Sequence, residues 1–148
     1  MLGDLYSQDG QPEGALQHYI RAVALNPENS DVQYRLGKLL LTQGRMAEAI
    51  PHLQSAAEHR EDASLAYAIG TALLQQKRPL EGIPYLRRAV QLDPNRKDAL
   101  NDLGIAVETQ GDIRGATDYF RKALEIDPQY FVARKNLERA EQLLARKR

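Results

Sequence analysis

The chain of 148 residues contains no cysteine and no tryptophan. The absence of cysteine excludes disulfide bonds and thiol chemistry, and it leaves a cytoplasmic location only as the default expectation. Basic and acidic side chains number 20 each, so the chain has no net charge. Nucleic-acid-binding proteins normally carry a basic excess, so we expect no nucleic-acid partner. No apolar run approaches the roughly 20 residues that span a bilayer, so we also expect no membrane partner.

Four glycines recur along the sequence at a nearly constant spacing. Each follows a large aliphatic residue, and the successive spacings are 34, 33 and 34 residues. A fixed period of this length is typical of stacked copies of one supersecondary unit. The four residues are Gly3, Gly37, Gly70 and Gly104.

The unit is clearest in its fourth copy, residues 97–128. Apolar residues at helical spacing predict a first helix. Gly111 and Asp112 then predict a turn and an N-cap, and a second apolar stripe follows until Pro128 ends it. Each copy is therefore expected to be a helix, a short turn and a second helix.

The other copies align with the fourth in several columns. In each second helix a small residue is followed one turn later by a bulky one. Small residues that face large ones let paired helices approach closely and interdigitate. The small residues are Ala15, Ala49, Gly82 and Ala116, and the bulky residues are Tyr19, Leu53, Leu86 and Phe120.

These columns resemble the tetratricopeptide repeat, whose signature is leucine-glycine in the first helix, followed by alanine, an aromatic residue, alanine and proline. The resemblance covers nearly the whole chain. It implies an all-α, right-handed solenoid of helix-turn-helix repeats, about four in number, with the first repeat truncated and a C-terminal capping helix. The predicted single domain over 1–148 consists of partial repeat 1 (1–27), repeat 2 (30–62), repeat 3 (63–96), repeat 4 (97–128) and the capping helix (129–148).

Two features depart from the repeat pattern. Gly3 lies too near the start for a complete first helix, and an incomplete repeat leaves an apolar face exposed. We therefore expect either a segment cut from a longer protein or a natural chain that starts with a degraded repeat. The exposed face would be covered by a preceding repeat or by a second copy in a homodimer. Pro51 and Pro84 occupy equivalent places in their second helices. Because a proline inside a helix costs about 3 kcal/mol, we expect both to lie close to the helix start.

The sequence offers no motif for catalysis or for cofactor binding, such as a phosphate-binding glycine loop or a nucleophile elbow. His52 and His59 are two helical turns apart, about 10 Å, which is too far to share a metal ion. His18 and His52 occupy a column that holds tyrosine in later copies, which indicates semi-buried packing. We expect no catalytic, cofactor-binding or metal-binding residues and no enzyme activity.

In tetratricopeptide proteins the first helices line the concave face, so the resemblance implies which side chains a groove would present. Tyr34 and Tyr67 share one column, and tyrosine offers a large contact area with little rotamer entropy to lose. Alternatively, these tyrosines only cover the neighbouring helix. The predicted partner-binding residues are Asp31, Tyr34, Lys38, Tyr67, Thr71, Gln75, Asn101, Ile105, Glu108, Lys135 and Arg139.

Chaperone-binding members of the family clamp a C-terminal carboxylate with lysine, arginine and asparagine side chains from three first helices. Neither possible register of this chain supplies that set. Starting from the second copy, the five places hold Tyr34, Lys38, Ala68, Asp98 and Asp102. Acidic residues repel a carboxylate, so the clamp is predicted to be absent.

The sequence thus predicts a protein-interaction scaffold that binds an extended peptide or a partner helix in its groove, without catalysis. The alternative is a regulatory or substrate-docking module of a larger multidomain enzyme.

Overall fold

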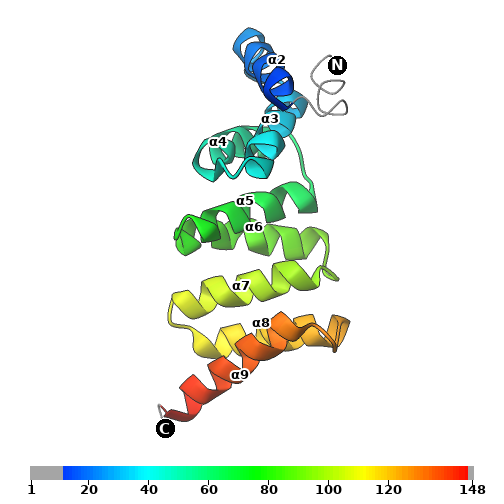
Figure 1. Cartoon of the computed structure of the whole chain (residues 1–148). Helices are drawn as coiled ribbons and strands as arrows, with labels where there is room; N and C mark the ends of the chain where they lie inside the picture. The colour runs from blue at the N-terminus through cyan, green and yellow to red at the C-terminus, as the bar shows by residue number, and fades with distance from the viewer. Residues whose placement is uncertain (1–11, 147–148) are drawn as a thin grey trace. The chain divides into compact units, whose positions relative to one another are not determined.

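The structure, a computed structural model, describes residues 12–146 (Figure 1). Over this range the regular structure consists of eight α-helices joined by short turns, with no strand. Gly3 and the rest of the predicted first helix of repeat 1 lie outside the described residues. The chain divides after Glu61 into two units, residues 1–61 and 62–148.

In the first unit, one central helix contacts two others. Its helices are α2 (Pro12–Leu25), α3 (Ser30–Thr42) and α4 (Met46–Ala57). α3 packs against both α2 and α4, and Leu36 and Leu53 are buried where α3 and α4 meet. α3 and α4 both fall within predicted repeat 2.

The second unit contains two helix pairs and one further helix. These are α5 (Ala63–Gln75), α6 (Pro79–Leu92), α7 (Lys97–Thr109), α8 (Ile113–Ile126) and α9 (Phe131–Arg146). α5 pairs with α6 and α7 with α8, and each pair falls within one predicted repeat. α5 also contacts α7, and α7 contacts α9. These three helices form one surface, the α5–α7–α9 face. The predicted repeat boundaries and the single domain over 1–148 stay predictions.

Side-chain caps begin three of the helices. Asp112 Oδ1 accepts a hydrogen bond from the Gly115 N–H at 2.8 Å, which confirms the predicted N-cap before α8. Asn29 and Asp62 cap α3 and α5 in the same way. Each cap satisfies backbone N–H groups that the first turn of a helix leaves without an internal partner.

The two helical prolines lie deeper in their helices than the sequence predicts. Pro51 and Pro84 are each the sixth residue of their helix, in its second turn. The prediction that both lie close to the helix start is therefore wrong by one turn. Proline has no N–H, so the carbonyls of Ala47 and Leu80 lack their helical partner. All four residues are exposed, and water can therefore hydrogen-bond these carbonyls.

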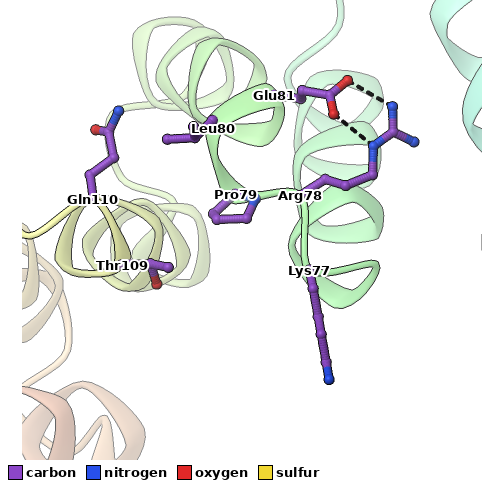
Figure 2. A pocket seen from close by; sticks show the side chains of 7 residues that line it. All are labelled: Lys77, Arg78, Pro79, Leu80, Glu81, Thr109 and Gln110. Atoms are coloured by element: carbon purple, nitrogen blue, oxygen red, sulfur yellow. Dashed lines mark hydrogen bonds and ion pairs between the residues drawn. The ribbon is translucent and has the colours of Figure 1, made fainter.

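The turns between paired helices require a left-handed backbone at one residue. Gly44 and Gly111 supply it in repeats 2 and 4, with φ angles of 73° and 92°. The same place in repeat 3 holds Lys77, with a φ of 58° (Figure 2). A residue with a Cβ is strained in this region, so Lys77 stores strain that glycine would not.

Glycine in each described first helix allows its second helix to approach closely. A Cβ added at Gly104 would lie 2.5 Å from a ring carbon of Phe120, which is far inside van der Waals contact. The bulky residue of the second helix thus faces the glycine of the first helix, a pairing that is not among the sequence-based predictions. Gly37 faces Leu53 and Gly70 faces Leu86 in the same manner, each at 2.6 Å.

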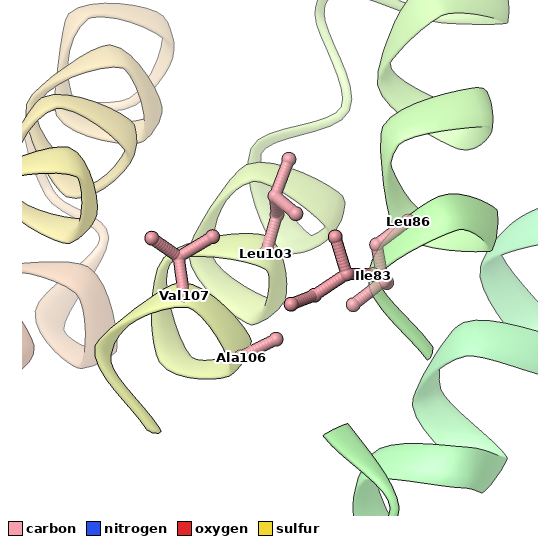
Figure 3. Packing of buried hydrophobic residues seen from close by; sticks show 5 residues of the cluster. All are labelled: Ile83, Leu86, Leu103, Ala106 and Val107. Carbon is pink, nitrogen blue, oxygen red and sulfur yellow. The ribbon is translucent and has the colours of Figure 1, made fainter. Parts of the chain in front are cut away.

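Successive repeats in the second unit share a core. Ile83 and Leu86 of α6 pack with Leu103, Ala106 and Val107 of α7, and all five are at most 5% exposed (Figure 3). The second helix of one repeat therefore buries its apolar stripe against the first helix of the next, as a repeat protein requires.

Gly104→Ala should lower the free energy of unfolding by about 1–3 kcal/mol, because the new methyl group overpacks the contact with Phe120. Urea denaturation followed by circular dichroism measures the change. Phe120→Leu removes the ring, so the double variant should lose less than the sum of the two single changes. Additive losses would show that this contact does not set the requirement for glycine.

Lys77→Gly should raise the free energy of unfolding by about 1 kcal/mol, since glycine adopts the left-handed region without the Cβ penalty. Lys77→Gln serves as the control, because it removes the charge and keeps the backbone strain. An equal gain in both variants in thermal melts would assign the effect to charge instead.

Candidate functional site

The predicted partner-binding residues fall into two sets. Asp31, Tyr34 and Lys38 lie on α3 in the first unit. The α5–α7–α9 face brings the other eight together: Tyr67, Thr71 and Gln75 on α5, Asn101, Ile105 and Glu108 on α7, and Lys135 and Arg139 on α9. A groove that includes both sets stays a prediction.

Tyr67 is fixed in position by contacts from two sides. Its hydroxyl donates a hydrogen bond to Asp102 Oδ2 on α7 at 3.2 Å. The guanidinium of Arg96 lies 5.0 Å from its ring centroid and also donates to Ser64 Oγ at 3.2 Å. Tyr67 is half-buried, and part of it packs against the α6–α7 core, so the rest of the side chain is accessible in a fixed orientation.

The first unit contains the same arrangement around Tyr34. The guanidinium of Arg60 lies 4.4 Å from the Tyr34 ring centroid and forms an ion pair with Asp31 at 3.0 Å. Lys38 lies 5.4 Å from the same centroid. In both units an arginine that follows the second helix stacks on the tyrosine of the preceding first helix, and cation–π contact stabilises such pairs.

Asn101 lies beneath the surface of the α5–α7–α9 face. It is 2% exposed, and its Oδ1 accepts a hydrogen bond from Asn136 Nδ2 on α9 at 2.8 Å. Its own Nδ2 donates to Asp102 Oδ1 at 3.2 Å. Asn101 therefore joins α7 to α9 and orients Asp102, and little of it is available to a partner.

The carboxyl of Asp102 on this face has a raised pKa. Burial raises the pKa of its carboxyl above the ordinary 3.8 and outweighs the hydrogen bonds from Asn101 and Tyr67, while the charge of Asp98 raises it further. Burial, followed by the charge of Asp102, raises the pKa of Tyr67 as well. Tyr130, just before α9, also has a raised pKa, from burial and then from Asp102 and Asp98. The carboxylates of Asp98 and Asp102 thus lie near both tyrosines, and the guanidinium of Arg96 pairs with Asp98 there.

The remaining predicted residues differ in how accessible they are. Arg139 forms an ion pair with Glu108, whose side chain is only 13% exposed. The Thr71 hydroxyl donates to the Tyr67 carbonyl at 2.9 Å. Ile105 is half-buried and packs against a core cluster shared by α8 and α9, whereas Gln75 and Lys135 are exposed.

The predicted partner-binding residues do not include Asp102, Asn136 or Arg96, although the comparison with the carboxylate clamp places Asp102 in the groove. Tyr67 and Asn101 occupy equivalent places in their repeats. Each bonds to the residue one position after the equivalent place in the following repeat, Tyr67 to Asp102 and Asn101 to Asn136. Aligning repeats column by column hides such diagonal contacts. A signal was present, since Asn101 and Asp102 are adjacent polar residues between the apolar Leu100 and Leu103.

The histidine column predicted to be semi-buried includes His52 on α4. His52 is half-buried, and its Nδ1 lies 2.7 Å from Gln33 Oε1, which confirms the predicted semi-buried packing. Burial lowers the pKa of His52. Within residues 12–146 no three histidine, aspartate or glutamate side chains gather closely enough to hold a metal ion. None of the described helices has both the length and the apolar character to cross a bilayer.

Comparison with known families agrees with this architecture. A tetratricopeptide repeat family model matches residues 1–66 and again residues 67–131. The chain belongs to the tetratricopeptide repeat family. The predicted fold class, an all-α solenoid of such repeats, is confirmed by this match and by the solved structures that the chain resembles.

Several solved tetratricopeptide repeat structures superpose closely on the chain. YrrB, described as a protein with an unusual peptide-binding site, is 26% identical with a TM-score of 0.90, over 97% of this chain and 74% of that one. MamA is 24% identical with a TM-score of 0.89, over 98% and 85%. The first repeat domain of Spaghetti (RPAP3), bound to the HSP90 peptide SRMEEVD, is 22% identical with a TM-score of 0.73, over 78% and 93%. Comparison with curated protein sequences gives no match.

The raised pKa of Asp102 predicts a pH-dependent stability of this tetratricopeptide repeat protein. An acid whose pKa is raised by folding favours the folded state below its unfolded pKa, and that contribution is lost as the pH rises through the folded pKa. Asp102→Asn does not titrate. Its free energy of unfolding should therefore increase relative to wild type as the pH rises above 3.8, the ordinary value for aspartate.

Urea denaturation of both proteins at a series of pH values measures this difference. Tyr67→Phe provides a second arm, because loss of the hydroxyl donor should raise the pKa of Asp102 further and extend the pH range of the effect. A wild-type-minus-variant difference that is independent of pH would contradict the assignment.

Proposed function

We propose that the chain is a protein-interaction scaffold that binds an extended peptide or a partner helix on its first helices and has no catalytic activity of its own. Peptide binding by YrrB and by the Spaghetti domain supports this role. The proposed contact surfaces are the α5–α7–α9 face and the face of α3 that carries Tyr34.

The fixed orientation of Tyr67 is the observation that carries the proposal. Asp102 and Arg96 hold this side chain while part of it remains accessible. A binding residue that is already ordered loses little conformational entropy when a partner arrives. Tyr34 is held by Arg60 in the same way. Covering a neighbouring helix and presenting a contact surface are thus compatible roles for the same tyrosine.

The structure changes the proposed roles of some predicted residues. Tyr67, Gln75 and Lys135 are accessible and are the proposed direct contacts, together with the half-buried Thr71. Asn101 is assigned a positioning role, because it is buried and its amide is engaged by Asn136 and Asp102.

Charge indicates what kind of peptide this face would accept. Asp98 is 44% exposed, forms an ion pair with Arg96 at 3.8 Å and lies near the half-buried Asp102 carboxyl. Two carboxylates beside this one guanidinium leave an excess of negative charge, which disfavours an acidic segment. The proposed partner is therefore neutral or basic where it contacts the start of α7, unlike the acidic HSP90 peptide bound by the Spaghetti domain.

Replacement of both tyrosines, Tyr34→Ala with Tyr67→Ala, should weaken binding of a partner recovered with the wild-type protein at least about tenfold, since such anchors carry a large share of binding energy. Affinity capture from native lysate identifies the partner, and calorimetry with the purified partner gives the dissociation constants. Unchanged affinity would exclude these faces.

Tyr85→Ala is the matched control for that experiment, because Tyr85 is a half-buried tyrosine on a second helix, α6. It should bind the partner as the wild type does. Circular dichroism verifies that all variants are folded. An equal loss in the control would assign the effect to general destabilisation.

A further inference from the structure

A surface depression lies at the turn end of the second unit, beginning two residues after Gln75, and none of its lining residues is among the residues proposed to contact a partner. Its volume is about 680 Å³, and Figure 2 shows the side chains that surround it. They come from the α5–α6 turn, the first turn of α6 and the end of α7. The lining residues are Lys77, Arg78, Pro79, Leu80, Glu81, Thr109 and Gln110.

The depression has an apolar side. Leu80 is 61% exposed, and the half-buried Pro79 precedes it. In Figure 2 these two side chains face Thr109 and Gln110 across the open space. Removing such apolar surface from water is favourable in free energy, so an apolar side chain of a partner can bind here.

The rim of the depression carries one positive charge that is not neutralised. Arg78 and Glu81 neutralise each other through two hydrogen bonds, both of 2.7 Å. Lys77 is exposed, its side chain extends away from Pro79 in Figure 2, and none of the described residues pairs with its ammonium group. The lysine also occupies a left-handed position that its counterparts Gly44 and Gly111 fill without strain. This rim therefore attracts an anion.

We propose that this depression is a second protein-interaction surface, which receives an apolar side chain of a partner peptide flanked by carboxylates. The apolar side chain covers Leu80 and Pro79, and a neighbouring carboxylate pairs with the Lys77 ammonium. The Thr109 hydroxyl donates to the Ile105 carbonyl at 2.8 Å, so its oxygen can accept a hydrogen bond from a peptide N–H, and the Gln110 amide can donate to or accept from the peptide backbone. The surface shares no residue with the proposed contacts on the α5–α7–α9 face and has the opposite charge preference.

Titration of the full chain with a defined probe tests the proposal. The probe is the acetylated and amidated hexapeptide Glu-Asp-Leu-Phe-Glu-Asp, and the matched probe replaces all four acids with lysine. In two-dimensional NMR spectra the acidic peptide should shift the backbone amide signals of residues 77, 78, 80 and 81 and of residues 109 and 110. The basic peptide should bind at least several-fold more weakly.

Two substitutions separate the apolar and the ionic contribution. Leu80→Ser should weaken binding of the acidic peptide about tenfold, as loss of a buried leucine contact does. Lys77→Gln should weaken it about threefold and reduce its dependence on salt, as expected for an exposed ion pair. Leu92→Ser is the matched control, because Leu92 is an exposed leucine at the other end of α6, and it should have no effect.

Tyr67→Ala should also leave binding of the acidic probe unchanged, so failure here and failure of the proposed peptide-binding face are distinguishable. Absence of signal shifts, shifts centred on Tyr67 instead, equal binding of the basic peptide, or an equal effect of Leu92→Ser would each overturn the proposal.

Discussion

The close contact between the two helices of each repeat is the constraint on which the rest of the structure depends. At Gly104 there is no room for even one methyl group between the first helix and Phe120 of the second. This close approach leaves α6 and α8 to bury their remaining apolar residues against the next helix, as Ile83 does against Leu103 and Val107. The stacking of repeats and the alignment of α5, α7 and α9 on one face both follow from this contact.

Because the apolar core is confined to these helix contacts, polar side chains can join the first helices on their shared face. The bonds from Tyr67 to Asp102 and from Asn136 to Asn101 each connect adjacent repeats. A buried amide or carboxyl must be hydrogen-bonded to be tolerated, so these bonds fix the spacing of the three helices as well as stabilise them. The surface offered to a partner is therefore held rigid by the same groups that give it negative charge.

The sequence predicts features that lie within one repeat, and it misses contacts between side chains of different repeats. The Asp112 cap depends on residues within one repeat, and the structure confirms it. The burial of Asn101 depends on Asn136 in another repeat and in a different column, which alignment of equivalent positions does not pair. Helix propensity alone disfavours proline in a helix interior, and it therefore predicts Pro51 and Pro84 nearer the helix start than the structure has them. Ala47 and Leu80, whose carbonyls lose their helical partners, are exposed residues, so water can reduce that penalty.

Two residues depart from the repeat pattern and change the charge of the surface in their own repeat. Repeat 3 places Lys77 where the repeats on either side have glycine, and repeat 4 places Asp102 where the capping helix has Asn136. Neither residue is favoured by local stability, since one strains the backbone and the other is an acid whose pKa is raised by burial. Glycine and asparagine would fit the same places without charge. Both charged residues therefore change the surface that the second unit presents to a partner. Asp102 adds a negative charge beside Tyr67, and Lys77 adds a positive charge at the depression that contains Leu80. The two surfaces consequently favour different ligands.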